Sequence, residues 1–209
     1  MDEKLEEYLN LEKLKAKSLI YATNKHMNQK RKYTGEDYIN HPLEVALKIL
    51  EYMKNENFSD KECTIMYCSA ILHDTVEDTS ATIEEIETFA GKEIADIVNW
   101  LTNVSKPEDG NRKIRKMKDL EHIMSAPLPA ICIKIADVIC NCKGMVEVDR
   151  KYSNGEFCKK YIPEKMIFYN FLTKLKIPYD LNLTQYEIIF SKMLKELKEV
   201  LNKELELLN

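Results

Sequence analysis

An apolar run that ends in two ionisable residues constrains this chain more than any other feature. Residues 60–73 are the most apolar stretch with helical spacing, which is typical of a central core helix, and the doublet His73-Asp74 closes the run. Burying an imidazole beside a carboxylate costs free energy unless something neutralises and binds both groups. A divalent cation does both, so the doublet predicts a metal site at the end of a core helix.

Composition favours an all-α fold. The chain has 209 residues with only five Gly and six Pro, and it is rich in Lys, Glu and Leu. This length supports one sizeable core without disulfides, and no linker, low-complexity tract or repeat divides the sequence. We therefore expect a single domain over residues 1–209, a helical bundle of roughly eight to ten helices. Its core is expected at about 20–150 and its C-terminal helices at 157–209.

Apolar periodicity places most of the individual helices. The expected ranges are about 3–30, 42–55, 60–73, 92–102, 111–125 and 131–145, followed by two C-terminal helices of which the last spans about 185–208. Loops are expected at 103–110 and 153–155. Pro127 and Pro129 are expected to lie in front of the helix at 131–145.

One short helix is predicted from its ends. Thr82 with Glu85 forms the sequence signature of a capping box, and Gly91 is a residue that commonly ends a helix. We therefore expect a short helix between Thr82 and Gly91.

The charge and the cysteine content limit where the protein can be located and what it can bind. The net charge of −4, from 31 Lys and Arg against 35 Asp and Glu, gives no general footprint for nucleic acid or an anionic membrane. The six cysteines lack the spacing of a secreted framework, no signal peptide is seen, and no apolar run approaches the ~18 residues of a membrane span. We expect a cytoplasmic protein that binds neither nucleic acid nor membrane, with Cys140 and Cys142 as core thiols. The oligomeric state is left open.

Two further ligand candidates, His41 and Asp137, lie on either side of the doublet. Neighbouring helical residues diverge by ~100°, so His73 and Asp74 can share an ion only near a frayed helix end. Two imidazoles and two carboxylates form a mixed ligand set that leaves positions for water. Such a set suits manganese or ferrous iron, and zinc, cobalt and nickel stay open as alternatives.

The order His, His-Asp, Asp is the signature of the HD-domain metal-dependent phosphohydrolases. Over about residues 20–150 the chain resembles the hydrolase domain of the Rel/SpoT family and its stand-alone small alarmone hydrolases. The matching stretches are 29–35, 38–46, 72–79, 101–106 and 134–137. The resemblance implies removal of the 3′-pyrophosphate from (p)ppGpp with manganese, in a chain without room for a nucleotide synthetase domain.

Two acids lie one turn beyond the metal ligands. Glu77 and Asp78 could orient or deprotonate the attacking water, because hydrolysis needs a water made nucleophilic at neutral pH. The resemblance implies the same role for this pair. The alternative interpretation is a solvated, charged turn before the next helix.

Three residues are candidates for substrate binding. Arg31 and Lys32 precede the His41 segment, and the resemblance implies that they handle the guanine nucleotide; an Arg can stack on a base and fork to a phosphate, whereas Lys is a point charge. Asn141 follows Asp137 by four residues, on the same helix face, and matches the nucleoside-contacting Asn of the family. A solvated helix end and a capping or core amide are the plainer interpretations.

The resemblance weakens beside the predicted site. The family usually reads Arg-Leu-His-Asn after the last ligand, where this chain has Val138-Ile139-Cys140-Asn141, and its Arg-Lys segment carries one extra residue. Two alternatives therefore stay open: hydrolysis of another nucleotide or small phosphorylated metabolite, and nucleotide binding without turnover. We interpret His26 as structural or as a support for the metal ligands, and His122 as exposed. The basic helix at 111–125 is interpreted as a solvated face rather than a surface for phosphates or nucleic acid.

Overall fold

The computed structural model describes residues 2–153, 155–175 and 184–208. Within these ranges the regular structure consists of eleven α-helices, one 3₁₀ turn and a single isolated β-bridge between Lys30 and Asp37. The prediction of an all-α protein is confirmed. With the four-residue α4 set aside, the number of helices in the described chain falls within the predicted range.

The helices follow the sequence in a simple order. They are α1 (Glu3–Lys25), α2 (Asn40–Met53), α3 (Asp60–Leu72), α4 (Thr75–Asp78), α5 (Ile83–Ala90), α6 (Lys92–Leu101), η1 (Pro107–Asp109), α7 (Arg112–Met124), α8 (Leu128–Cys142), α9 (Met145–Ser153), α10 (Cys158–Leu172) and α11 (Gln185–Leu208).

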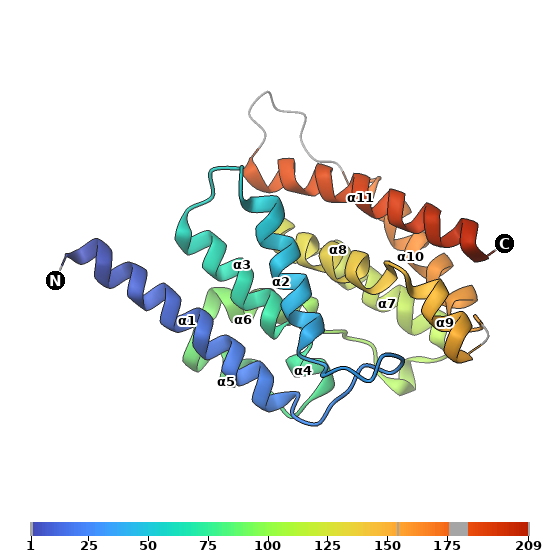
Figure 1. Cartoon of the computed structure of the whole chain (residues 1–209), viewed down its shortest axis with the longest axis horizontal. Helices are drawn as coiled ribbons and strands as arrows, with labels where there is room; N and C mark the ends of the chain where they lie inside the picture. Colours follow the sequence, from blue (N-terminus) through green and yellow to red (C-terminus); the bar gives the residue numbers. More distant parts are fainter. Residues whose placement is uncertain (1, 154, 176–183, 209) are drawn as a thin grey trace.

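Two apolar helices form the centre of the bundle. Most residues of α3 and α8 are buried, as their continuous apolar sequences predict. Helix α2 packs against both of them, α1 packs against α3, and α11 packs along α8. Figure 1 shows α11 running beside α8 along one edge of the bundle, whereas the first turns of α1 extend past α3 into solvent. The described helices include none that is long and apolar enough to cross a membrane.

Capping residues fix the starts of α3 and α5. Ser59 and Glu62 form a reciprocal capping box at α3, so the helix that carries the doublet has a defined beginning. The predicted box of Thr82 and Glu85 is confirmed at α5. Gly91, with φ of 91°, separates α5 from α6, a backbone conformation that favours glycine.

Helix α1 is shorter than predicted. It ends at Lys25 rather than near residue 30, because Asn28 adopts a left-handed conformation with φ of 68° that an α-helix does not contain. The turns that follow carry residues 26–39 back toward the start of α2. This loop brings Arg31 and Tyr38 to the site described below.

The region around residue 128 differs from the prediction in a second way. Helix α8 begins at Leu128 and includes Pro129, because a proline is tolerated in the first helical turn, where its missing N–H has no partner to lose. The helix ends at Cys142, ahead of Gly144 with φ of 72°. Helix α9 was not predicted, and of the loop expected at 153–155 residue 154 lies outside the described residues.

Candidate metal centre

The predicted ligands come from the ends of helices and from the middle of α8. His41 is the second residue of α2, and Asp137 lies in the centre of α8. His73 is the C-cap of α3, and Asp74 is the N-cap of α4. The doublet therefore occupies a junction between two helices, which relaxes the divergence that a continuous helix would impose on adjacent side chains.

Three of these side chains converge on one point. His41, His73 and Asp74 each offer a ligand atom, and these atoms lie within 4.8 Å of one another. The Nε2 atom of His73 is 3.0 Å from Oδ2 of Asp74, and Nε2 of His41 is 3.8 Å from the same oxygen. Both imidazoles are almost fully buried. The three ligand atoms are close enough together for one ion to contact all of them.

Asp137 lies beside this group. Its Oδ1 atom is 3.1 Å from Nε2 of His41 and 3.9 Å from Nε2 of His73. The carboxylate is also held by its own helix, because Asn141 donates a 2.5 Å hydrogen bond to Oδ1 and Lys134 lies 2.9 Å from Oδ2. Asp137 is therefore close enough to join the cluster, although Lys134 neutralises part of its negative charge.

An unpartnered imidazole nitrogen tests whether a cation fits. The Nδ1 atom of His73 lies 2.7 Å from the carbonyl oxygen of Ala70, which can only accept, so Nδ1 carries the proton. Nε2 is buried and makes no well-aligned hydrogen bond within the described chain, although Oδ2 of Asp74 lies 3.0 Å away. A buried polar atom of this kind is costly unless something binds it. The donor set of imidazole and carboxylate therefore fits a divalent cation.

The electrostatics of the cluster favour positive charge. Burial acts to lower the pKa of His73, but Asp74 and Asp137 outweigh burial and raise the pKa to about 9. Burial likewise opposes ionisation of both carboxyls, yet His73 keeps the pKa of Asp74 below its ordinary value and Lys134 does the same for Asp137. The carboxylates are thus ionised and attract a cation.

The predicted acid pair lies on α4, at the open side of the cluster. Asn103 donates a 2.6 Å hydrogen bond to Glu77, and the hydroxyl of Tyr38 lies 3.0 Å from Oδ2 of Asp78. Both carboxylates keep solvent-exposed surface. Desolvation by the surrounding protein raises the pKa of each, and the negative charge of Asp74 raises it further. Such carboxyls are suited to exchanging protons with water near the ion.

Tyr38 joins the two parts of the site. Its hydroxyl lies 2.7 Å from Oδ2 of Asp74 and 3.0 Å from Oδ2 of Asp78. The ring packs on the imidazole of His26 with a centroid distance of 4.8 Å. His26 is buried, and its Nδ1 lies 2.8 Å from the side-chain oxygen of Gln29. These contacts agree with the structural role expected for His26.

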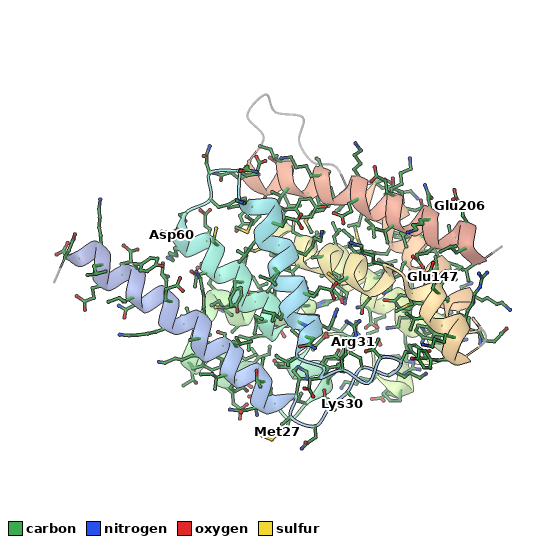
Figure 2. The ribbon with its side chains drawn as sticks, in the orientation of Figure 1. Met27, Lys30, Arg31, Asp60, Glu147 and Glu206 are labelled. Carbon is green, nitrogen blue, oxygen red and sulfur yellow. The ribbon has the colours of Figure 1, made fainter. Side chains whose placement is uncertain are left out.

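The substrate candidates are placed differently from one another. Arg31 donates a 3.2 Å hydrogen bond to Oδ1 of Asn141, which in turn bonds Asp137. Figure 2 shows Arg31 on the loop between α1 and α2, with Lys30 nearer the end of α1. Lys32 instead lies over the rings of Tyr33 and Phe157, at 5.2 and 5.8 Å from their centroids. The structure therefore brings Arg31 and Asn141 to the cluster and turns Lys32 toward an aromatic group.

Sequence reasoning missed three residues that contact the site. Tyr38 and Asn103 both lie in stretches that match the Rel/SpoT family, so the signal was present without an assigned role. Lys134 precedes Asp137 by one helical turn, a spacing that predicts contact. One interpretation is wrong: His122 is partly buried and stacks on Trp100, with ring centroids 4.8 Å apart. Cys140 and Cys142 are buried free thiols, as expected.

A family comparison places this arrangement among known proteins. A model described as the HD domain matches residues 18–156, which include the four predicted ligands and the acid pair. The chain belongs to the HD domain family. The match covers well over half of the sequence, and it ends within the loop where α9 gives way to α10.

Curated relatives of this HD domain are much longer proteins. The chain is 34% identical over 150 residues to a protein named GTP pyrophosphokinase rsh from Brucella melitensis biotype 1, covering 69% of this chain and 19% of the relative. It is 36% identical over 146 residues to a protein named guanosine-3′,5′-bis(diphosphate) 3′-pyrophosphohydrolase from Aquifex aeolicus, covering 68% and 20%. The chain spans about a fifth of the length of these relatives.

Two solved structures share the fold of this HD domain. One, described as a metazoan orthologue of SpoT that hydrolyzes ppGpp, superposes with a TM-score of 0.61 at 22% identity, covering 87% of this chain and 94% of that chain. A protein from Listeria monocytogenes gives a TM-score of 0.53 at 25% identity, covering 82% and 99%. In contrast to the curated relatives, both are matched over nearly their whole length.

Proposed function

We propose that this HD domain is a metal-dependent hydrolase that removes the 3′-pyrophosphate from guanosine-3′,5′-bis(diphosphate). The observation that carries the proposal is the convergence of His41, His73 and Asp74 beside the acid pair Glu77 and Asp78. A relative that is 36% identical over the same region is named as an enzyme of this activity. Binding alone does not call for two proton-exchanging carboxylates beside a metal site.

We assign the ion to His41, His73, Asp74 and Asp137, with manganese as the metal in use. When bound, a divalent ion lowers the pKa of a coordinated water and neutralises charge on the phosphate. The bond from Nδ1 of His73 to Ala70 fixes the ring with Nε2 toward the cluster, where a metal ion would take the place of the Nε2 proton. Lys134 neutralises part of the negative charge of Asp137, which reduces the repulsion between the Asp74 and Asp137 carboxylates in the protein interior.

The acid pair handles the proton of the attacking water. Hydrolysis joins a water oxygen to the phosphorus and breaks the bond from that phosphorus to the 3′-oxygen of the ribose. The water loses a proton to Glu77 or Asp78, and the 3′-oxygen takes one up as the diphosphate leaves. The raised pKa of each carboxyl makes it a stronger proton acceptor than an ordinary carboxylate.

Arg31, Lys32 and Asn141 bind the nucleoside part in this proposal. Arg31 is only 24% exposed and already pairs with Asn141, so its planar guanidinium is held in one orientation beside Asp137. A flat cation in a fixed orientation can stack on a purine base and attract phosphate at once. Lys32 has to leave the Tyr33 and Phe157 rings to reach the same ligand.

A second candidate is hydrolysis of a different phosphorylated nucleotide. It is favoured by the buried Val138 and Cys140, which stand where the Rel/SpoT family has Arg and His beside the site. A substrate panel separates the two candidates. With manganese, guanosine-3′,5′-bis(diphosphate) should yield pyrophosphate and guanosine 5′-diphosphate as resolved by anion-exchange chromatography. Release of orthophosphate, or turnover of other nucleotides only, would assign the second function; no turnover of any member would leave a binding protein.

A further inference from the structure

A cavity of about 320 Å³ lies beside the metal centre, between α6, α7, α8 and α10. Two residues of its wall also contact the site. The Nζ atom of Lys134 is 2.9 Å from Oδ2 of Asp137, and Asn103 donates a hydrogen bond to Glu77. The cavity therefore begins where the candidate active site ends.

The wall of the cavity carries an excess of positive charge. Its cationic side chains are Arg112, Lys113, Lys116, Lys134 and Lys165, against the carboxylates of Asp119 and Glu164. Both carboxylates are already engaged. Glu164 accepts two 2.8 Å hydrogen bonds from Arg112, and Asp119 accepts from the backbone and hydroxyl of Ser105. Of the other cations, Lys134 pairs with Asp137 and Lys116 lies 4.0 Å from Asp119, so Lys113 and Lys165 are the two that have no carboxylate within 4.0 Å in the described chain.

Lys165 is the more buried of these two cations, since Lys113 is exposed. It is partly buried on α10, and in the described parts of the chain no carboxylate lies within 4.0 Å of its ammonium. Its closest aromatic neighbour is Tyr161, whose ring centroid is 4.8 Å from Nζ. Burial, and next the charge of Lys134, lower the pKa of Lys165 to about 8. An anion placed between the two ammonium groups would relieve this repulsion.

Three polar side chains lie along one face of α8 and set the order of the binding groups from one end of the site to the other. Lys134, Asp137 and Asn141 follow one another at spacings of three and four residues, which places them in a row along one side of the helix. Arg31 bonds Asn141 at one end of the row, and the basic cavity adjoins Lys134 at the other. The metal cluster lies between these ends. A substrate with a nucleoside at Arg31 and its scissile phosphate at the cluster has its next phosphate at the cavity.

We propose that the cavity is a phosphate subsite in which Lys134 and Lys165 hold the terminal phosphate of the diphosphate that leaves. This inference rests on the proposed function for the order of groups along α8, and on the cavity itself for the charge. A subsite of this kind distinguishes pyrophosphate from orthophosphate, because only a diphosphate carries a second phosphate for the two lysines to hold while the first lies at the cluster.

Calorimetric titration of the purified protein with inorganic pyrophosphate and with orthophosphate tests the subsite. We expect pyrophosphate to bind more tightly than orthophosphate, and Lys165→Met to weaken pyrophosphate binding about tenfold, the loss of one charge-assisted hydrogen bond. Lys165→Arg should preserve it. Lys160→Met is the matched control, since Lys160 is an exposed lysine of the same helix outside the cavity. Equal binding by the Lys165→Met and Lys160→Met variants would overturn the subsite.

A measurement on the unaltered protein covers the case in which Lys165→Met fails to fold. Acetylation by acetic anhydride, read by mass spectrometry, should be slowed at Lys165 by pyrophosphate and unaffected at Lys160. Equal protection of both lysines, or of neither, contradicts the subsite. Binding is read here without turnover. Binding that depends on Lys165 in a protein without hydrolytic activity would therefore refute the proposed function alone, and hydrolysis with binding independent of Lys165 would refute the subsite alone.

Discussion

The hydroxyl of Tyr38 donates a hydrogen bond of 2.7 Å to Oδ2 of Asp74. The same oxygen of Asp74 faces both imidazoles of the cluster, so the phenol orients the carboxylate that the ion would share with His41 and His73. Groups that orient a metal ligand through a hydrogen bond commonly matter nearly as much as the ligand. The segment between α1 and α2 thus contributes to the site through a residue that is not a ligand.

We predict that Tyr38→Phe lowers metal affinity or kcat by about 10- to 100-fold, because the change removes only the hydroxyl that orients Asp74. Metal dissociation and steady-state rates measured on one preparation would separate the two effects. Tyr21→Phe is a suitable control, since the Tyr21 hydroxyl also bonds a carboxylate, that of Glu85, outside the cluster. Losses of similar size in both variants would reduce Tyr38 to a packing residue.

Asp74→Ala should abolish metal retention and turnover together. Asp74 lies within 4.0 Å of both imidazoles, and its loss leaves Asp137, already paired with Lys134, to compensate two buried histidines. Metal content by mass spectrometry and the melting temperature with and without chelator provide the measurement, because a bound ion stabilises the folded state. Asp96→Ala, at an exposed position paired with Lys92, is the control. Full activity in thoroughly chelated wild-type protein would defeat the assignment of a metal centre.

The pH dependence of the rate should identify the general base. Desolvation raises the pKa of both Glu77 and Asp78, and a base must be ionised to accept a proton, so the rate should fall with decreasing pH already above the ordinary carboxyl range. The hydrogen bond from Asn103 lowers the pKa of Glu77, and that from Tyr38 lowers the pKa of Asp78. Asn103→Ala therefore moves the acid limb upward if Glu77 is the base, and Tyr38→Phe does so if Asp78 is.

The size of the rate loss completes the same experiment. If Glu77 is the base, Glu77→Gln should keep the metal and lose about 100- to 10,000-fold in kcat, the usual contribution of a general base. Metal content and pH–rate profiles of the variants give both readouts. A loss below about threefold, with an unchanged acid limb in Asn103→Ala, would reassign Glu77 to structure.

Local signals were sufficient for much of this architecture. The apolar sequence of α3, the capping box of Thr82 and Glu85 and the spacing of α11 are properties of neighbouring residues, so they could be predicted from the sequence. Helix α9 was missed because it is only nine residues long and four of them are charged (Glu147, Asp149, Arg150 and Lys151). The start of α8 was misplaced because Pro129 was interpreted as a break rather than a first-turn residue.

The candidate site likewise has some features that the sequence could predict and others that it could not. The ligand candidates could be named because ionisable residues inside apolar sequence are unusual, and their convergence follows once α2, α3 and α8 pack together. Contacts between distant segments could not be predicted. The bond from Arg31 to Asn141 spans 110 residues, and the approach of α10 to Lys134 depends on how the last helices close over α8.

A buried carboxylate links the C-terminal helix to this region. Glu204 on α11 is 1% exposed and accepts 2.9 Å hydrogen bonds from the backbone N–H groups of Gly144 and Val146, at the turn that follows Asn141. Glu204→Ala leaves two buried donors unpaired, so it should lower the free energy of unfolding by about 2–4 kcal/mol. Urea unfolding measures the loss, and exposed Glu206→Ala is the control. A loss below about 0.5 kcal/mol, the range of ordinary surface changes, would show that α11 is not anchored through this contact.

Arg31→Ala tests how the nucleoside part is recognised. The guanidinium of Arg31 lies 3.2 Å from Asn141 and 3.7 Å from Glu44, which holds its plane beside the metal cluster. Removing it should lower kcat/KM for guanosine-3′,5′-bis(diphosphate) by roughly five- to thirtyfold, the equivalent of about 1–2 kcal/mol for a partly desolvated contact with a base. The loss for p-nitrophenyl phosphate should be smaller, because that ester has no purine to stack on the guanidinium.

Lys32→Ala supplies the comparison within the same segment. Lys32 carries the same charge but lies on the rings of Tyr33 and Phe157, so its removal should act on both substrates alike and more weakly than that of Arg31. Steady-state kinetics of the two variants on the two substrates give four ratios that separate stacking from charge. Equal losses for both substrates in Arg31→Ala would mean that Arg31 supplies charge alone. No loss for either would make the Arg31–Asn141 bond a structural contact, and recognition of a guanine nucleotide would then have to come from residues beyond this pair.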